Sequence, residues 1–179
     1  MDKFKLIFWN EFKRIFCYHT RLRNIIEKKT TCWKKYSLLT DIKINEMKKI
    51  IKDNNIKVLI LDMDGTIKHY KKGLLPCNKK WVEEIKKYVK IYIISNANKK
   101  MTSEVANLMN VPYINSAKKP SPKGFLKILK EEKITGEEAI VIGDAIICDI
   151  IGSKYAGINK SILLDDMNIN INNKKINFF

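Results

Sequence analysis

Two aspartates separated by a single residue, Asp62 and Asp64, follow an apolar run and determine which chemistry this sequence can support. The run Ile56-Lys57-Val58-Leu59-Ile60-Leu61 predicts a buried strand that ends in a tight loop. At the end of a strand both carboxylates can face one crevice, while Gly65 lets the backbone turn and Thr66 offers a hydroxyl. One carboxylate can attack an electrophile while the other transfers a proton.

A divalent cation is the expected companion of these two acids. Carboxylates held this close repel each other and raise one another's pKa unless a positive charge lies between them and the substrate. Hard oxygen ligands favour Mg²⁺. The sequence therefore predicts a Mg²⁺ site at this strand end, although the segment by itself also fits an ordinary turn.

Three later segments add polar residues that could belong to the same site. Each follows an apolar run or precedes a helix, and each has an ordinary explanation when taken alone, as a cap, a solvated charge or a helix N-terminal acid. They are Ser95 and Asn96 after Ile91–Ile94, Lys119 ahead of a helix expected to open at Ser121-Pro122, and Gly143-Asp144 with Asp149 after Ala139–Ile142. Their order in one chain indicates a single site.

Over residues 56–164 the four segments resemble the four motifs of the haloacid dehalogenase superfamily, whose phosphotransferases use an aspartate nucleophile. The resemblance implies that Asp62 attacks phosphorus and becomes an aspartyl phosphate. It implies that Asp64 protonates the leaving oxygen and later activates water, and an acid at this position favours a phosphatase. A charge clamp on the phosphoryl group suits this chemistry, because phosphoryl transfer depends mainly on positioning and on neutralising charge.

The resemblance also implies a ligand set for the phosphoryl group and the metal. The phosphoryl oxygens would be held by Ser95 and Lys119, with Thr66 and Asn96 as lesser contacts. The Mg²⁺ would be bound by Asp62, by the backbone carbonyl of Asp64 and by Asp144. Asp149 would be a further ligand or would support the others.

The spacing of the motifs bears on the size of the substrate. Residues 63–94 and 96–118 leave no room for the cap domain that many relatives fold over small metabolites. An open site suits a phosphate displayed on something large, which can itself exclude water: a membrane lipid, a protein or a nucleic-acid end.

A narrower resemblance connects the chain to the YqeG-type family, which includes phosphatidylglycerophosphate phosphatases. It rests on Ile56-Lys57-Val58, on Ser116-Ala117-Lys118-Lys119-Pro120, and on Gly143-Asp144 with Asp149, Gly152 and Gly157. The sequence departs from that family at Gly65, Ala145, Cys148 and Lys154-Tyr155, where the family usually has Asn, Gln, Thr and Asn-Arg. The implied product of the reaction is phosphatidylglycerol.

The order of the expected elements predicts an α/β fold. Strands and helices alternate across residues 56–164, which is typical of a doubly wound parallel sheet with its site at the carboxyl ends of the strands. We expect a phosphatase domain over residues 37–164, opened by a helix over residues 37–53 that leads into the first strand. Residues 165–179 form an Asn/Ile/Lys-rich tail in which Ile169 and Ile171 could add an edge strand.

The N-terminal extension, residues 1–36, is basic and amphipathic. Phe4, Phe8 and Phe12 fall on one helical stripe while most Lys and Arg residues fall elsewhere, a pattern typical of a helix in a membrane interface. We expect residues 1–30 to bind an anionic membrane surface and the protein to be cytoplasmic and peripherally membrane-associated. A helix that packs on the domain, or a mitochondrial transit peptide, is the alternative.

Composition leaves two other classes of function open. The net charge of +16 would attract any polyanion, and a nucleic-acid 3′-phosphatase or a protein phosphatase could use the same open site. The fold could also serve as a non-catalytic membrane-binding module, but the presence of all the motif acids together with Lys119 argues against that. Four Cys without a Cys-x-x-Cys pair indicate reduced thiols in a cytosol-like compartment, and the presence of only two His argues against a histidine-based metal or nucleophile site.

Overall fold

The computed structural model describes residues 31–69 and 73–165 of the 179-residue chain. The amphipathic pattern of residues 1–30 and the tail beyond residue 165 lie outside the described residues, as do residues 70–72. The expectations of an interfacial helix and of an edge strand at Ile169 and Ile171 therefore stay predictions.

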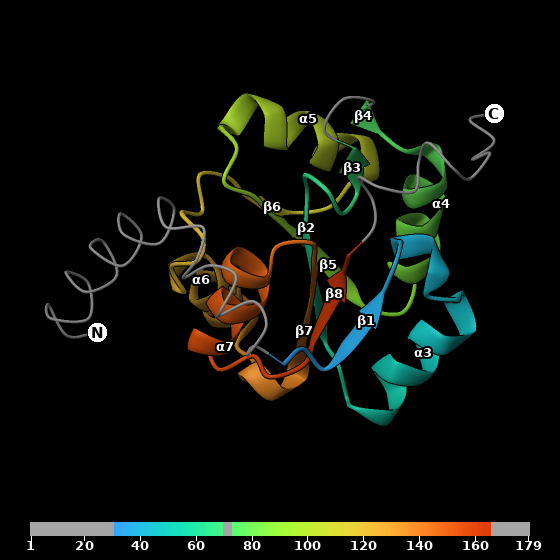
Figure 1. The fold of residues 1–179 in the computed structure, drawn as a ribbon, viewed down its shortest axis with the longest axis vertical. Helices are drawn as coiled ribbons and strands as arrows, with labels where there is room; N and C mark the ends of the chain where they lie inside the picture. The colour runs from blue at the N-terminus through green and yellow to red at the C-terminus, as the bar shows by residue number, and fades with distance from the viewer. Residues whose placement is uncertain (1–30, 70–72, 166–179) are drawn as a thin grey trace, which may run out of the picture. The chain divides into compact units, whose positions relative to one another are not determined.

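The described residues build a parallel six-stranded sheet in the order β1-β8-β7-β2-β5-β6 (Figure 1). Every pair of neighbouring strands in it is parallel. The strands are β1 (Lys34–Tyr36), β2 (Val58–Asp62), β5 (Lys90–Ile94), β6 (Tyr113–Ile114), β7 (Ala139–Gly143) and β8 (Ser161–Leu164). All residues of β2, β7 and β8 are buried, as expected where helices cover both faces of a parallel sheet.

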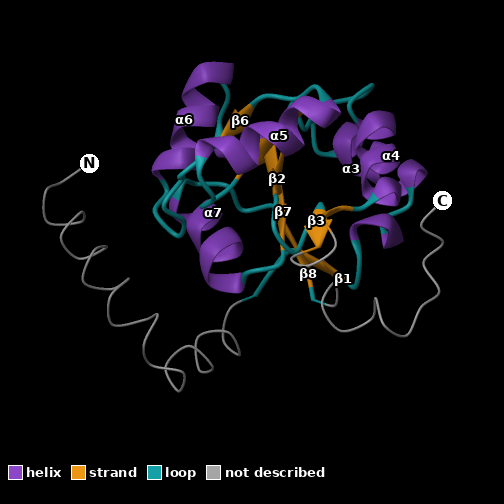
Figure 2. Ribbon diagram, turned by 90° about the horizontal axis from the view of Figure 1, so that it is seen from above, coloured by secondary structure: helices purple, strands orange, loops and turns teal. Residues whose placement is uncertain are grey.

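Helices lie on both faces of this sheet (Figure 2). They are α3 (Ile44–Asp53), α4 (Pro76–Ile85), α5 (Lys99–Met109), α6 (Lys123–Glu132) and α7 (Gly152–Tyr155), with short turns η1 (Leu39–Asp41) and η2 (Gly136–Glu138) and a π-helical segment η3 (Ile146–Ile151). Alternate residues of β2 enter two separate cores: Leu59 and Leu61 pack with α3, α4 and α5, whereas Val58 and Ile60 pack with α6. The predicted doubly wound α/β fold is confirmed.

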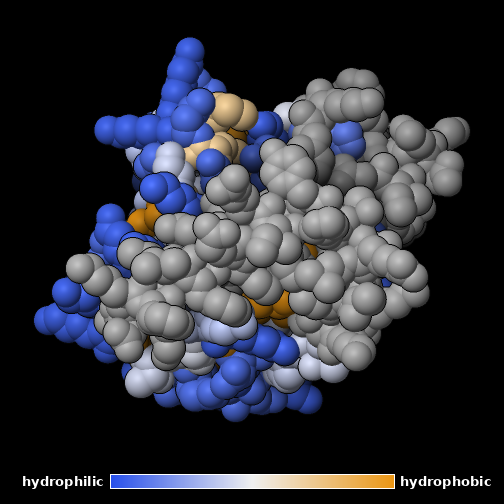
Figure 3. Space-filling model, turned by 60° about the vertical axis from the view of Figure 1, so that its left-hand side comes forward, coloured by the Kyte–Doolittle hydropathy of each residue, from blue (hydrophilic) through white to orange (hydrophobic). Residues whose placement is uncertain are grey.

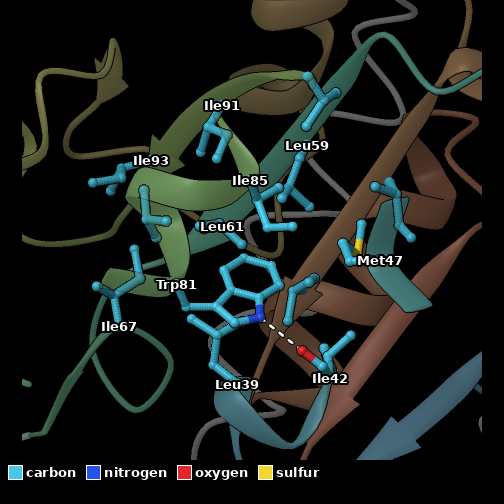
Figure 4. Packing of buried hydrophobic residues seen from close by; sticks show 14 of the residues in the cluster. Leu39, Ile42, Met47, Leu59, Leu61, Ile67, Trp81, Ile85, Ile91 and Ile93 are labelled. Atoms are coloured by element: carbon cyan, nitrogen blue, oxygen red, sulfur yellow. Dashed lines mark hydrogen bonds between the residues drawn. The ribbon is translucent and has the colours of Figure 1, made fainter. Parts of the chain in front are cut away.

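The first of these cores ties the start of the domain to the sheet (Figure 4). Trp81 of α4 packs among Leu39, Ile42 and Ile85, and its indole Nε1–H donates a 2.7 Å hydrogen bond to the carbonyl of Ile42. A buried indole N–H needs such a partner, so the contact holds the segment before α3 against α4.

A small hairpin follows β2 where a cap domain could have been inserted. It consists of β3 (Lys68–His69) and β4 (Gly73–Leu74). Buried Asn78 at the start of α4 donates hydrogen bonds to the carbonyls of Thr66 and Ile67, which fixes the turn between β2 and the hairpin. The described residues between Asp62 and Ser95 thus form the hairpin, α4 and β5, in agreement with the spacing argument.

Three local features differ from expectation. β1 is an edge strand of the sheet, although residues 34–36 were expected to belong to the N-terminal extension. The polar residues of β1 carry no strand pattern, and its pairing with β8 defines it as a strand. α3 begins at Ile44 rather than near residue 37. α6 begins at Lys123 with Pro122 as its N-cap, one residue later than the expected start with Ser121 as the cap.

No helix of the described part of the chain is long and apolar enough to cross a bilayer. The part of the surface that is coloured in Figure 3 is mostly hydrophilic, with small hydrophobic areas between the polar side chains.

Candidate active site

The four sequence segments meet in one pocket at the carboxyl ends of the central strands. The pocket has a volume of about 150 Å³, and seven of its lining residues are those that the sequence singled out: Asp62, Asp64, Ser95, Asn96, Lys119, Asp144 and Asp149. They come from β2, from the loops after β5 and β6, and from the segment after β7. Parallel strands bring these loops to one edge, which is why residues far apart in sequence converge.

Three carboxylates of this pocket form a cluster. Asp62, Asp144 and Asp149 each present an oxygen, and these oxygens all lie within 4.8 Å of one another. A set of hard oxygen donors at this spacing fits a divalent cation such as Mg²⁺. The side chain of Asp64 does not belong to the cluster, and the expectation that its backbone carbonyl is a ligand stays a prediction.

Two glycines create the space that the acids occupy. A Cβ on Gly65 would lie 2.5 Å from Cγ of Asp144, and a Cβ on Gly143 would lie 2.5 Å from Cβ of Asp149. Ordinary contacts begin at 3.4 Å, so neither position accepts a larger residue without movement of the acid. Gly65 also has a φ of +87°, which favours glycine for a second reason.

Lys119 lies at the centre of the site and is almost fully buried. Its ammonium donates to Asp62 Oδ1, to Asp149 Oδ1 at 2.6 Å and to the backbone carbonyl of Ile94 at 3.3 Å. The three donors of the ammonium are therefore all used. A buried cation of this kind requires such partners, since an unpaired one would be too costly to bury.

The pKa values of Asp62 and Lys119 follow from their burial and from the excess of carboxylates around them. Burial raises the pKa of Asp62 to about 8; Lys119 opposes this effect, whereas Asp149 and Asp144 add to it. Burial alone would lower the pKa of Lys119, but Asp149 and Asp62 outweigh it and hold that pKa above its ordinary value. One ammonium does not balance three carboxylates, so a bound divalent cation would favour the ionised form of Asp62.

The carboxylate of Asp149 is held on both sides. Oδ1 accepts from Lys119, and Oδ2 accepts the backbone N–H of Ala145 at 3.0 Å. Of the two roles left open for Asp149, this arrangement favours that of a residue that orients Lys119 over that of a direct metal ligand. The π-helical turn η3 carries Asp149 into this position.

Asp64 stands apart from the cluster at the side of the pocket. Its Oδ1 accepts from Lys68 Nζ at 3.1 Å, and its side chain is partly exposed. A carboxyl group that reaches solvent and has one cationic neighbour can exchange a proton with water, as a general acid and base must. Lys68, on β3, was not identified from the sequence.

Two residues follow β5 into the pocket. Buried Ser95 accepts the N–H of Ala97 at 3.0 Å through Oγ, so its hydroxyl hydrogen remains available for a phosphoryl oxygen. The side chain of Asn96 forms two hydrogen bonds with the backbone of Lys119. The role of Asn96 as a phosphate contact stays a prediction, and the structure adds this second interaction.

Thr66 is the one predicted site residue that does not line the pocket. It is fully buried, and its Oγ1 has no hydrogen-bond partner in the described part of the chain. The proposed contact between Thr66 and a phosphoryl oxygen therefore stays a prediction.

Two of the departures from the YqeG-type pattern also line the pocket. Ala145 contributes its backbone N–H to Asp149, a contact that any residue except proline could make. Cys148 directs its Sγ to the Lys119 carbonyl at 3.7 Å. Of the remaining departures, Tyr155 on α7 is well exposed.

The domain is a doubly wound parallel sheet with a candidate carboxylate nucleophile, Asp62, at the end of a central strand. A family model for haloacid dehalogenase-like hydrolases matches residues 72–157. The matched residues are just under half of the chain and include Ser95, Lys119, Asp144 and Asp149 but not Asp62 and Asp64.

The probable phosphatase YqeG of Bacillus subtilis (strain 168) is 29% identical over 109 residues, which are 60% of this chain and 63% of that protein. The match thus spans less than two thirds of the length of this relative.

Solved structures share the fold at low sequence identity. An uncharacterized protein from Listeria monocytogenes serotype 4b superposes with a TM-score of 0.53 at 20% identity, covering 69% of this chain and 86% of that one. The cobalt-bound deoxy-D-mannose-octulosonate 8-phosphate phosphatase of Haemophilus influenzae gives 0.52 at 16% identity, with 67% and 75% covered. A haloacid dehalogenase-superfamily hydrolase, subfamily IA, from Geobacter sulfurreducens PCA gives 0.51 at 14% identity, with 65% and 98% covered.

Proposed function

We propose that this protein is a Mg²⁺-dependent phosphomonoester hydrolase that works through an aspartyl phosphate. The observation that carries the proposal is the placement of Asp62 at the end of β2, beside Lys119 and within a cluster of three carboxylates. The similarity to a probable phosphatase supports the same reaction class.

Each residue has a chemical task in this scheme. Asp62 attacks phosphorus, and Asp64 gives a proton to the leaving oxygen and later takes one from water. Ser95 and Lys119 hold the phosphoryl oxygens, for which Lys119 must exchange one of its present acceptors. Mg²⁺, held by Asp62, Asp144 and the Asp64 carbonyl, would supply charge neutralisation at the phosphoryl group.

The substrate that suits this site best is a phosphate displayed on a large or membrane-bound molecule, such as phosphatidylglycerophosphate. The described residues of the hairpin after β2 and of the segment from α5 to β6 are too few to enclose a small metabolite. The resemblance to the YqeG-type family supports a lipid headgroup in particular.

The loops after β5 and β6 offer a basic surface to such a substrate. Lys99, Lys100 and Lys118 are exposed, and within residues 31–69 and 73–165 none of them forms an ion pair. Lys99 and Lys100 open α5, whose first turn has no acid, although positive charge is unfavourable at a helix N-terminus. The stability of α5 does not explain the two lysines at its N-terminus, whereas electrostatic attraction of an anionic surface to the region beside the pocket does.

The membrane itself would be reached through residues 1–30, whose basic and aromatic pattern suits an anionic bilayer surface. In this scheme the protein acts on the cytoplasmic leaflet as a peripheral enzyme. A mitochondrial location is the alternative.

A substrate panel tests the proposal. Short-chain phosphatidylglycerophosphate, a 3′-phosphorylated oligonucleotide and a phosphopeptide would be compared with an aryl phosphate, with and without Mg²⁺ and in excess chelator. We expect the lipid to give the highest kcat/KM, and Asp62→Asn to abolish turnover of every substrate because an amide does not attack phosphorus. Preference for the oligonucleotide or the phosphopeptide would replace the lipid assignment, and undiminished turnover by Asp62→Asn would refute the mechanism.

The contribution of the three lysines is tested with a charge-matched control. The triple variant Lys99→Gln/Lys100→Gln/Lys118→Gln should lose about tenfold in kcat/KM on the anionic lipid, because exposed charge pairs are individually weak and three act together. The control replaces Lys49, Lys80 and Lys130 by Gln; these lysines are exposed and lie on α3, α4 and the end of α6. Equal losses in both variants would show that only the net charge matters.

A further inference from the structure

The side chain of Asn96 forms two hydrogen bonds with the backbone of one residue on another loop, Lys119. Its Oδ1 accepts the backbone N–H of Lys119 at 2.6 Å, and its Nδ2 donates to the backbone carbonyl of Lys119 at 3.0 Å. Asn96 follows β5, whereas Lys119 lies in the loop after β6. The amide therefore fixes the peptide units on both sides of the Lys119 Cα relative to the end of β5.

The loop that carries Lys119 has a conformation that needs external support. Ser116 and Lys118 have φ values of +46° and +57°, in the left-handed region that residues other than glycine rarely adopt. Two backbone bonds hold the first part of this loop: the N–H of Ser116 donates to Ala97 and the N–H of Ala117 donates to Ser95. Beyond Ala117, the support that comes from the β5 loop is the side chain of Asn96.

The position of the Lys119 backbone decides where its ammonium lies. The ammonium is buried between Asp62 and Asp149, with each of its three donors directed at an acceptor. Because all three donors are directed at acceptors, the packed site accommodates the Lys119 ammonium in a single position. A displacement of about 1 Å costs about 100-fold in rate when it misplaces a group that acts on the transition state.

We propose that Asn96 is a positioning residue that sets the location of the Lys119 ammonium through the Lys119 backbone. This inference rests on the proposed function only for its kinetic consequence, because the hydrogen bonds themselves are independent of any reaction. A direct contact between Asn96 and phosphate is a different role: Nδ2 has a second hydrogen that could reach a phosphoryl oxygen. A double-mutant cycle separates the two roles.

The kinetic arm uses Asn96→Ala, Lys119→Met and the double variant, with an aryl phosphate as substrate. Asn96→Ala should lower kcat about 10- to 100-fold in the wild-type background. In the Lys119→Met background the same substitution should change kcat by less than about threefold, because the group that it positions is no longer present. If the losses multiply in the double variant, Asn96 acts on the substrate directly and the positioning role is refuted.

The matched control lies two residues further along the chain. Asn98 is the N-cap of α5 and accepts the N–H of Met101 at 3.0 Å, without a contact to Lys119. Asn98→Ala should lower the unfolding midpoint through loss of the cap while kcat changes by less than about threefold. An equal loss of kcat in Asn98→Ala and Asn96→Ala would show a general effect of loosening this loop, and would overturn the proposal.

A second arm needs no turnover and decides the matter if Lys119→Met is too slow to measure or if the protein hydrolyses no phosphomonoester. Amide hydrogen exchange, followed by NMR, should become at least about tenfold faster at Lys119 in Asn96→Ala, whereas the Ala117 amide, which donates to Ser95, should change less. Asn96→Ser, a smaller disturbance, should show the same pattern if the alanine variant does not fold. Unchanged protection of the Lys119 amide would refute the proposal.

Discussion

Replacement of Gly65 by alanine should separate backbone strain from the loss of metal binding. The residue has a φ of +87°, and a Cβ would lie 2.5 Å from Asp144 Cγ. Ordinary contact begins at 3.4 Å, so the carboxyl group would have to move by about 0.9 Å (3.4 − 2.5 Å) or more. That movement takes Asp144 out of the three-carboxylate cluster, and we expect Mg²⁺ affinity to fall at least about tenfold, or about 1.4 kcal/mol.

Gly157 supplies the matched control. Its φ of +85° is nearly the same as that of Gly65, but a Cβ there would meet nothing within 4 Å. Both alanine variants should lose about 1 kcal/mol of unfolding free energy in chelator, since the left-handed region costs alanine about this much. Only Gly65→Ala should also lose Mg²⁺ binding in isothermal titration calorimetry and stabilisation by Mg²⁺ in thermal unfolding. Equal Mg²⁺ affinity in the two variants would refute the assignment of Asp144 as a ligand.

Three further outcomes follow from the site and from its surroundings. Asp64→Asn should slow the hydrolysis of substrates with poor leaving groups far more than that of good ones, because a good leaving group departs without a proton; equal losses across a series of aryl and alkyl phosphates would exclude the general-acid role. Lys57 and the Thr135 backbone lower the pKa of Glu138 to about 2. The contribution of ionised Glu138 to stability is therefore complete above about pH 4.5 and is lost as the pH falls towards 2. Glu138→Gln should reduce the loss of stability between these two pH values, as measured by unfolding followed by circular dichroism. Deletion of residues 1–30 should release the protein from anionic liposomes in a flotation assay and spare the turnover of a soluble aryl phosphate; a loss of both would mean that the segment supports the domain.

The sequence was sufficient for the central strands and for the residues that meet at their ends. Apart from Lys90 at the start of β5 and Asp62 at the end of β2, the strands β2, β5 and β7 are continuous apolar runs, and a strand buried on both faces has this composition. Because the carboxyl ends of parallel strands share one edge, the polar residue after each run could be assigned to one site without coordinates. All of them except Thr66 line the same pocket.

Elements that depend on partners were not predictable in the same way. β1 has only three residues and no apolar alternation, and it becomes a strand because β8 offers it an edge. The sequence signal at Ser121-Pro122 predicted the start of α6 to within one residue, because Pro122 is its N-cap, while Ser121 is used in a turn by donating its backbone N–H to the carbonyl of Lys118. The amide of Asn96 gave no signal of its role either, since hydrogen bonds between distant loops leave no periodic pattern.

Backbone conformation alone does not explain why glycine occupies position 65. A positive φ alone explains either glycine or asparagine, and the YqeG-type family usually has Asn here. In this chain the carboxylate of Asp144 fills the space that any side chain at position 65 would need. The backbone turn therefore permits both residues, while the present position of Asp144 permits only glycine. Two residues that are distant in sequence are thus constrained as a pair, so an asparagine at position 65 requires the acid at 144 to take up another position in the same pocket.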